Sequence, residues 1–186
     1  MKTVVINLLG GSGCGKSTAS CGLFYELKRK QRNVELVREY VKAWAWQGIK
    51  VGPFDQPYIF GKQLKMETSL YGKVQYIITD SPLLLSPMYE MFYNNGESLV
   101  YESCMKHIEK AKKSNVEYIN FMLKRTKKYN PEGRYETEER AREFDQFLRD
   151  GLDRLGISYI DIESEDDQKV NEILNYISVL EHKVLA

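Results

Sequence analysis

Cysteine is scarce in this chain of 186 residues, and the three that occur, Cys14, Cys21 and Cys104, are widely spaced. An odd and scattered set argues against a disulfide framework and favours a reducing compartment. Long apolar runs are also missing, because no stretch of 18 apolar residues is present to span a membrane. The apolar segment at residues 4–9 is too short and too polar for a secretion signal, so we expect a cytoplasmic protein without membrane association.

An excess of charge of one sign is lacking as well, since 27 basic residues nearly balance 26 acidic residues and the net charge is +1. The chain as a whole therefore has no electrostatic attraction for nucleic acids or membranes, although local basic patches are compatible with this balance. A hydrophobic content of 42% and a charged content of 28% are ordinary for a folded domain. No repeat, low-complexity tract or linker divides the sequence, so residues 1–186 are expected to form a single domain.

Five short apolar segments, each typical of a buried strand, alternate with segments of helical periodicity. These predicted strands lie at residues 1–9, 34–37, 74–79, 117–122 and 157–162. The alternation predicts an α/β fold with a mostly parallel sheet. Ligands of such sheets bind beyond the carboxyl ends of the strands, so the polar residues that follow the strands are the first candidates for a functional site.

The strongest motif follows the first strand, where Gly-Gly-Ser-Gly-Cys-Gly-Lys-Ser at residues 10–17 matches G-x-x-x-x-G-K-[ST] in full. Glycines allow backbone N–H groups to face an anion, and the start of the next helix favours negative charge. Lys16 is expected to reach the β- and γ-phosphates of ATP, and the Ser17 hydroxyl is expected to bind Mg²⁺. The residues expected to contact the nucleotide are Gly11, Ser12, Gly13, Cys14, Gly15, Lys16, Ser17 and Thr18. The motif leaves the acceptor open between water, a small molecule and a nucleic acid.

Single carboxylates follow the second and third strands. Glu39 is placed to orient an acceptor hydroxyl and remove its proton, although a solvated glutamate at a helix start is the alternative. Asp80 resembles a Walker-B position that holds Mg²⁺ directly or through water, and the alternative is an aspartate that caps a turn.

A basic segment follows the fourth strand, because residues 124–134 contain five cations and one acid. Glycine, proline and asparagine in this segment indicate mobility. We interpret residues 124–142 as a lid that closes over phosphates, with Arg125 and Arg134 as the catalytic cations, since guanidinium binds phosphate in a bidentate manner. The alternative is a solvated run of charge.

The sequence from Glu39 to Trp44 resembles the Glu-x4-Trp motif of deoxynucleoside kinases, in which the glutamate is the catalytic base. Residues 55–63 and 77–85 are similar to small viral kinases of the ATPase type and to the ribosylnicotinamide kinase domain of bacterial regulators. Residues 124–142 resemble the arginine-bearing lid of both groups. The resemblance implies a three-layer P-loop kinase fold over residues 1–186, with a five-stranded sheet in the order 2-3-1-4-5 and a basic lid.

The chain departs from deoxynucleoside kinases after the third strand, where it has Asp80-Ser81-Pro82 in place of their usual Asp/Glu-Arg-Ser. The missing arginine would have to be replaced by Arg38, Arg125 or Arg134. The segment that lines the acceptor site in this family contains aromatic residues and an amide, which either bind a flat base or belong to the core. These residues are Trp44, Trp46, Phe54, Tyr58, Phe60 and Gln63.

These features favour an ATP- and Mg²⁺-dependent kinase that phosphorylates a nucleoside, a nucleotide or a related ribosyl compound. We expect a small-molecule acceptor and a homodimer. One alternative is a kinase that acts on a hydroxyl of nucleic acid, which the basic lid allows and the balanced net charge disfavours. Another is a nucleotide-dependent switch, which would require a segment that changes between order and disorder.

Overall fold

The computed structural model describes residues 1–185, with side chains through residue 180. The strands are β1 (Thr3–Leu9), β2 (Val34–Val37), β3 (Tyr76–Thr79), β4 (Val116–Leu123) and β5 (Ile160–Ile162). The helices are α1 (Lys16–Arg29), α2 (Lys42–Trp46), α3 (Gln56–Thr68), α4 (Leu85–Tyr93), α5 (Tyr101–Lys113), α6 (Glu138–Arg154) and α7 (Lys169–Leu185). The predicted strands are all present, and β5 is the most shortened of them because it begins at Ile160 instead of residue 157.

The five strands form one parallel sheet in the order β2-β3-β1-β4-β5, which confirms the predicted order. The register places Thr79 of β3 beside Val37 of β2 on one side and beside Asn7 of β1 on the other. The carboxyl ends of these three strands therefore lie at one edge of the sheet. The segments that follow them begin side by side, although they are far apart in the sequence.

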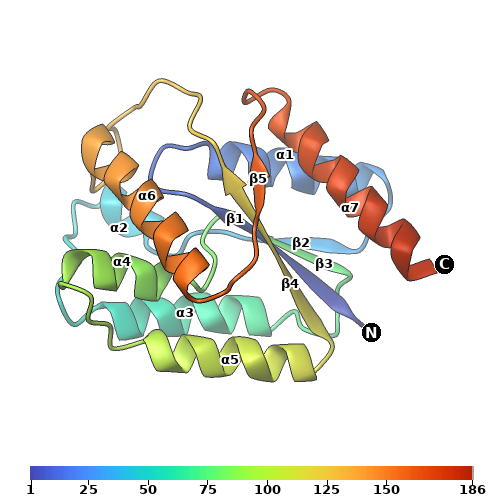
Figure 1. Ribbon diagram of the computed structural model, residues 1–186, viewed down its shortest axis with the longest axis horizontal. Coiled ribbons are helices and arrows are strands. Elements are labelled where there is room, and N and C mark those ends of the chain that lie inside the picture. The colour runs from blue at the N-terminus through green and yellow to red at the C-terminus, as the bar shows by residue number, and fades with distance from the viewer. Residues whose placement is uncertain (186) are drawn as a thin grey trace.

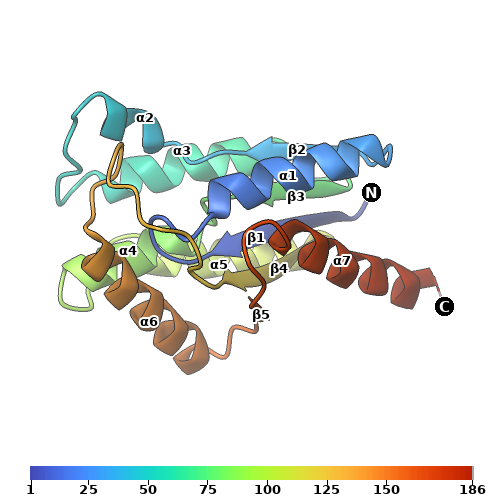
Figure 2. The ribbon, with the colours of Figure 1, turned by 90° about the horizontal axis from the view of Figure 1, so that it is seen from above.

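Helices cover both faces of the sheet and produce three layers (Figure 1). The core on one face joins β1 to α1 and α7, and the core on the other face joins β1 to α3, α4, α5 and α6. Figure 2 shows α1 and α7 together on one side of the molecule, away from α6. Ile6 and Leu8 of β1 belong to the first core and Val5 and Leu9 to the opposite core. A central strand buried on both faces explains its nearly continuous apolar sequence.

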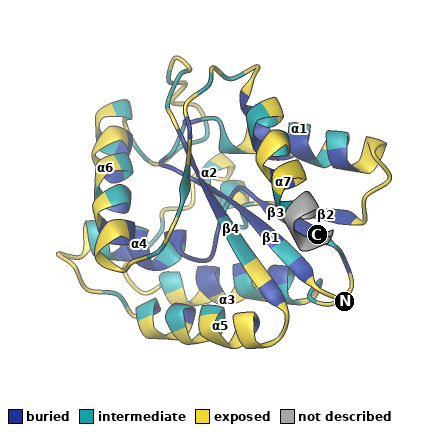
Figure 3. Ribbon diagram, turned by 45° about the vertical axis from the view of Figure 1, so that its right-hand side comes forward, coloured by how far each residue is buried: buried dark blue, intermediate teal, exposed yellow. Residues whose placement is uncertain are grey.

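Burial follows this layering, with buried residues along the strands and exposed residues on the outward sides of the helices (Figure 3). Among residues 1–185, every helix falls short of the length or the apolar character that crossing a bilayer requires.

The end of the basic segment is fixed by the start of α6. Thr137 caps this helix, because its side chain accepts a hydrogen bond from the backbone N–H of Arg140. Glu138 and Glu139 in the first turn stabilise α6, because their negative charges interact favourably with the positive end of the helix dipole. The predicted lid of residues 124–142 is thus irregular chain up to Thr137 and helix beyond it.

Candidate active site

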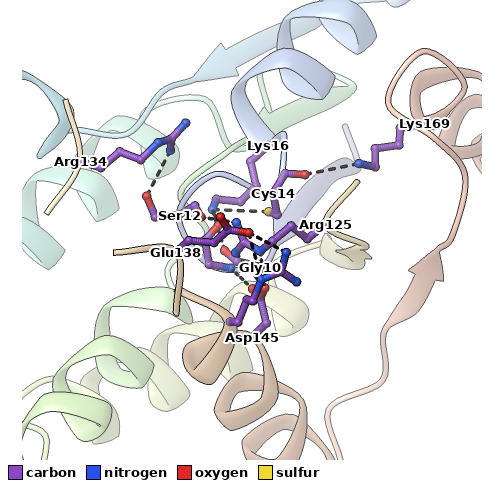
Figure 4. A network of polar contacts seen from close by, with 11 residues as sticks. Gly10, Ser12, Cys14, Lys16, Arg125, Arg134, Glu138, Asp145 and Lys169 are labelled. Atoms are coloured by element: carbon purple, nitrogen blue, oxygen red, sulfur yellow. Dashed lines mark hydrogen bonds and ion pairs between the residues drawn. The ribbon is translucent and has the colours of Figure 1, made fainter. Parts of the chain in front are cut away.

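The loop between β1 and α1 has the backbone that its glycines permit. Gly10, Gly13 and Gly15 have φ angles of 131°, 85° and 98°, which side-chain-bearing residues rarely adopt. A Cβ at Gly10 would lie 2.7 Å from the sulfur of Cys14. Lys16 Nζ donates hydrogen bonds to the carbonyls of Gly10 at 2.6 Å and Gly11 at 2.8 Å, so the ammonium group lies over the loop (Figure 4).

A cavity of about 830 Å³ opens beside this loop. Of the residues expected to contact the nucleotide, six line the cavity, namely Ser12, Gly13, Gly15, Lys16, Ser17 and Thr18. Gly11 and Cys14 are buried and do not line it. The Cys14 side chain is part of the core under α1 and α7, so only its backbone is available to a ligand at the loop.

Glu39 and Asp80 meet at the same edge of the cavity. The backbone N–H of Glu39 donates a hydrogen bond of 3.0 Å to Oδ1 of Asp80, which is only 5% exposed. Burial raises the pKa of Glu39, and the nearby Asp80 carboxylate raises it further. Lys16, Lys42 and Arg134 act in the opposite direction, because their positive charges stabilise the Glu39 carboxylate. The site thus holds a half-buried carboxylate between three cations and a second acid.

The basic segment closes over the loop and contacts α2. Arg134 Nη1 donates a hydrogen bond of 3.1 Å to Ser12 Oγ, and Lys42 Nζ donates one of 2.5 Å to the carbonyl of Gly133. The Trp46 ring occupies the space that a Cβ of Gly133 would need, at 2.7 Å. Arg134, Lys42 and Trp46 all line the cavity, so the lid and α2 form one wall.

The two predicted lid arginines have different positions. Arg125 donates to Asp145 Oδ2 through Nε at 3.1 Å and Nη2 at 2.8 Å, and Nη1 donates to the Ser12 carbonyl at 2.6 Å. The other oxygen of Asp145 accepts a hydrogen bond from the backbone N–H of Gly11. The Arg125 side chain is 4% exposed and does not line the cavity. Figure 4 shows Arg125 and Asp145 against the loop, with Arg134 apart from them.

A second polar cluster, absent from the sequence-based predictions, follows β5. Lys169 is 1% exposed and pairs with Asp166, and its Nζ donates to Thr126 Oγ1 at 2.8 Å and to the Cys14 carbonyl at 3.5 Å. Asp166 also pairs with Lys127 of the lid at 2.6 Å. Polar residues that follow a parallel strand are candidates for a functional site. Applied to the fifth strand, this rule would have predicted Asp166 as a candidate.

Helix α4 contributes five further residues to the cavity, namely Leu85, Ser86, Tyr89, Glu90 and Tyr93. The Tyr89 ring stacks on Phe144 with centroids 3.8 Å apart. Burial raises the pKa of the Tyr89 phenol, and the negative charges of Glu136 and Glu39 add to this shift. A glutamate within an otherwise apolar helix was the available sequence signal for Glu90.

The aromatic segment lines the cavity much less than the resemblance implied. Of its six residues, only Trp46 contributes to the lining. Phe60 and Gln63 are buried, Phe54 is 82% exposed, and Tyr58 stacks on Trp44 at 6.0 Å outside the cavity. Arg38 is exposed and does not line the cavity either.

The sheet order and the glycine-rich loop before α1 define the α/β fold of P-loop kinases. A family model described as an AAA domain matches residues 5–169, and the chain belongs to this family. Comparison with curated proteins finds no match.

Solved structures with this fold include kinases of nucleosides and nucleotides. Deoxyadenosine kinase from M. mycoides with bound dATP is 15% identical, with a TM-score of 0.56 over 95% of this chain and 99% of that chain. Thymidylate kinase from Ehrlichia chaffeensis is 15% identical, with a TM-score of 0.62 over 97% of this chain and 100% of that chain. Thymidylate kinase from Candida albicans is 13% identical, with a TM-score of 0.62 over 97% and 92% of the respective chains. At these identities the likeness shows the fold.

Proposed function

We propose that this chain is an ATP- and Mg²⁺-dependent kinase that transfers the γ-phosphoryl group of ATP to a nucleoside, a nucleotide or a related ribosyl compound. The observation that carries the proposal is the position of Glu39, a half-buried carboxylate in the same cavity as Lys16 and Asp80. A simple nucleotide switch does not require a carboxylate at this place, whereas transfer to an acceptor hydroxyl does.

The phosphate end of the site supplies positive charge and oriented donors. Lys16 and the N–H groups at the start of α1 would hold the β- and γ-phosphates, with Lys16 exchanging its contacts to the loop carbonyls for phosphate oxygens. Arg134 would stabilise the charge that develops on the transferred group. Ser17 and Asp80 offer the oxygen ligands that Mg²⁺ prefers, and the ion would neutralise phosphate charge.

The acceptor end uses Glu39 as general base. The acceptor oxygen attacks the γ-phosphorus, its proton passes to the Glu39 carboxylate, and the bond to the leaving ADP breaks. The raised pKa of Glu39 brings the base closer to neutral pH, where proton transfer is more favourable. For an acceptor that is already ionised, such as a monophosphate, Glu39 would act by orientation alone.

The size of the cavity supports a small-molecule acceptor. A volume of about 830 Å³ lies near the upper end of the range for small-molecule pockets. The cavity reaches from the phosphate loop to α2, α3 and α4, which leaves room beyond the phosphates for a second ligand. The kinases of deoxyadenosine and thymidylate that share the fold support an acceptor of the nucleoside or nucleotide class.

The test is ATP consumption by the purified protein with Mg²⁺ against nucleosides, their monophosphates, ribosylnicotinamide and short oligonucleotides. We expect one small acceptor to raise turnover well above hydrolysis by water. Glu39→Gln should lower that turnover by roughly 10²–10⁴-fold and retain ATP binding. Glu35→Gln is the matched control, because Glu35 is a partly exposed glutamate on β2 that lies outside the cavity.

Two results would contradict the proposal. Hydrolysis at the same rate with every acceptor, unchanged in Glu39→Gln, would favour a nucleotide switch. Stimulation by oligonucleotides alone, lost as salt is increased, would favour a kinase of nucleic acid.

A further inference from the structure

Glu90 is a buried carboxylate in the wall of the cavity, on α4 and away from the phosphate loop. The residue is 2% exposed. One oxygen, Oε2, accepts hydrogen bonds from Ser98 Oγ at 2.6 Å and from the backbone N–H of Leu99 at 2.9 Å. The other oxygen, Oε1, is buried and has no hydrogen-bond partner among the residues that the structure describes.

The two oxygens of Glu90 have different roles. Oε2 has a structural role, and Oε1 makes no hydrogen bond with the described residues of the protein. Oε2 holds the turn before α5, since Ser98 in turn accepts hydrogen bonds from the N–H groups of Val100 and Tyr101. That task needs one acceptor, which a glutamine would also provide. A buried acceptor without a partner is unfavourable. A ligand that donates a hydrogen bond to Oε1 would satisfy this acceptor, and that hydrogen bond would strengthen its binding.

The Gln56 side chain adds a second acceptor to the same cavity. Its Oε1 is also buried without a hydrogen-bond partner, at the start of α3. An amide can rotate to present either its oxygen or its nitrogen, so Gln56 adapts to a donor or an acceptor on the ligand. In Glu90, Oε2 already accepts two hydrogen bonds from the protein, which leaves Oε1 as the acceptor without a partner, so Glu90 is the residue that fixes the polarity of this wall.

We propose that Glu90 selects acceptor substrates whose ring carries an amino or carboxamide N–H group over counterparts that carry oxygen at that position. The inference rests on the proposed kinase function and narrows its substrates to ribosides of amino-bearing heteroaromatic rings. A ring that presents a carbonyl or a carboxylate to Glu90 leaves Oε1 unpaired and places two acceptors against each other. Sites built around a buried hydrogen-bonding group reject such analogues strongly.

The test uses pairs of ribosides in which oxygen replaces an amino group: adenosine and inosine, cytidine and uridine, and nicotinamide riboside and nicotinic acid riboside. Dissociation constants are measured by calorimetry with Mg²⁺ and a non-hydrolysable ATP analogue, and kcat/KM is measured with ATP. For the pair that the enzyme uses best, we expect the amino member to be favoured by about 10²-fold or more.

Glu90→Gln is the informative variant, because its oxygen can accept the hydrogen bonds from Ser98 and Leu99 while its NH₂ group takes the place of Oε1. We expect this variant to reduce the amino preference by at least about tenfold, or to reverse it, with the melting temperature preserved. Glu97→Gln is the matched control, since Glu97 is exposed on the same connection and does not line the cavity. It should leave the preference unchanged.

Equal use of both members of each pair, or a preference for the oxygen-bearing members, overturns the inference even if the protein is a kinase. An equal loss for both members in Glu90→Gln, together with a lower melting temperature, assigns Glu90 to structure alone. Failure to phosphorylate any riboside or nucleotide contradicts the proposed function, while the dissociation constants of the wild type still decide the preference. Should Glu90→Gln not fold, the wild-type comparison decides by itself, and binding of neither member overturns the inference.

Discussion

The backbone N–H of Glu39 is hydrogen-bonded to the Asp80 carboxylate over 3.0 Å, which ties the segment after β2 to the carboxyl end of β3. The parallel register of the two strands creates this contact, because Val37 lies beside Thr79. The contact fixes the backbone of Glu39 and also places a negative charge near its carboxylate. The proposed base and the proposed Mg²⁺ ligand are therefore coupled, and substitution of one changes the other.

Asp80→Asn should raise the Mg²⁺ concentration needed for half-maximal activity by about tenfold or more, because an amide is a weaker ligand than a carboxylate for this ion. The asparagine oxygen can still accept the hydrogen bond from Glu39, so the fold of the site should be retained. The measurement is activity against Mg²⁺ concentration, with circular dichroism as a control for folding. An unchanged Mg²⁺ requirement would remove Asp80 from the metal site.

The pH dependence of turnover should report the charges around Glu39. Its pKa is raised above the ordinary glutamate value, and a base works only when deprotonated. As the pH is lowered, kcat should therefore begin to decrease at a higher pH than it would with a base of ordinary glutamate pKa. Lys42→Met removes a charge that lowers this pKa and should move the acid limb to higher pH. Asp80→Asn removes a charge that raises it and should move the limb to lower pH.

These profiles are measured at saturating ATP, acceptor and Mg²⁺ between pH 5 and 9. Shifts of opposite sign in the two variants are the expected result. Shifts of the same sign, or an acid limb that neither variant moves, would show that another group is the base.

Arg125 and Arg134 should respond differently to removal. Arg125→Ala leaves Asp145 without its cation and loosens the phosphate loop at Ser12, so we expect the free energy of unfolding to fall by about 1–3 kcal/mol and ATP to bind more weakly. Arg134→Ala should preserve stability and lower kcat by about 10²–10³-fold, because the proposed donor to the transferred phosphate is lost.

The stabilities come from urea unfolding, and the rates come from steady-state kinetics. Arg142→Ala is the control, since Arg142 forms an exposed pair with Glu138 on α6 and such pairs contribute little. A fully stable Arg125→Ala protein that has lost turnover would assign the catalytic role to Arg125 instead.

The sheet and the phosphate end were predictable because their signals are local. A glycine-rich turn between a strand and a helix predicts the loop before α1, and the rule on the carboxyl ends of parallel strands predicts Glu39 and Asp80 at one edge. The separation of Arg125 from Arg134 was not predictable, because it depends on Asp145 reaching the loop from the middle of α6. Nothing in the amphipathic pattern of that helix distinguishes Asp145 from its solvated neighbours.

The part of the cavity proposed for the acceptor was the hardest to predict. Aromatic residues of α2, of α3 and of the loop between them suggested base binding, yet Tyr58 and Trp44 stack on each other outside the cavity. Tyr89 and Glu90 of α4 are among the residues that line the cavity instead, and the placement of these two depends on how α4 packs against α6 through Phe144. Such tertiary packing produces no hydrophobic periodicity and no motif that could be recognised in the sequence.

A buried glutamate far from the proposed catalytic residues should make the stability of the protein depend on pH. Glu67 on α3 is 0% exposed, and its Oε1 accepts hydrogen bonds from the hydroxyls of Tyr71 at 2.5 Å and Tyr118 at 3.2 Å. Burial raises the pKa of Glu67 to about 7. The Tyr71 hydroxyl also contacts His107 Nε2 at 3.1 Å, and burial lowers the pKa of that imidazole, which disfavours a cation beside Glu67.

Between the ordinary glutamate pKa of 4.5 and about 7, the unfolded chain loses the Glu67 proton while the folded chain keeps it, so this group lowers the free energy of unfolding as pH rises. Above pH 7 the full loss is present, about 3 kcal/mol for a shift of this size. Glu67→Gln stays neutral and keeps an acceptor for both tyrosines, so its stability relative to wild type should increase by about that amount from pH 5 to pH 8. Urea unfolding at the two pH values measures this difference, with exposed Glu97→Gln as the control. Parallel pH dependence in Glu67→Gln and wild type would show that Glu67 is ionised in the folded protein at neutral pH.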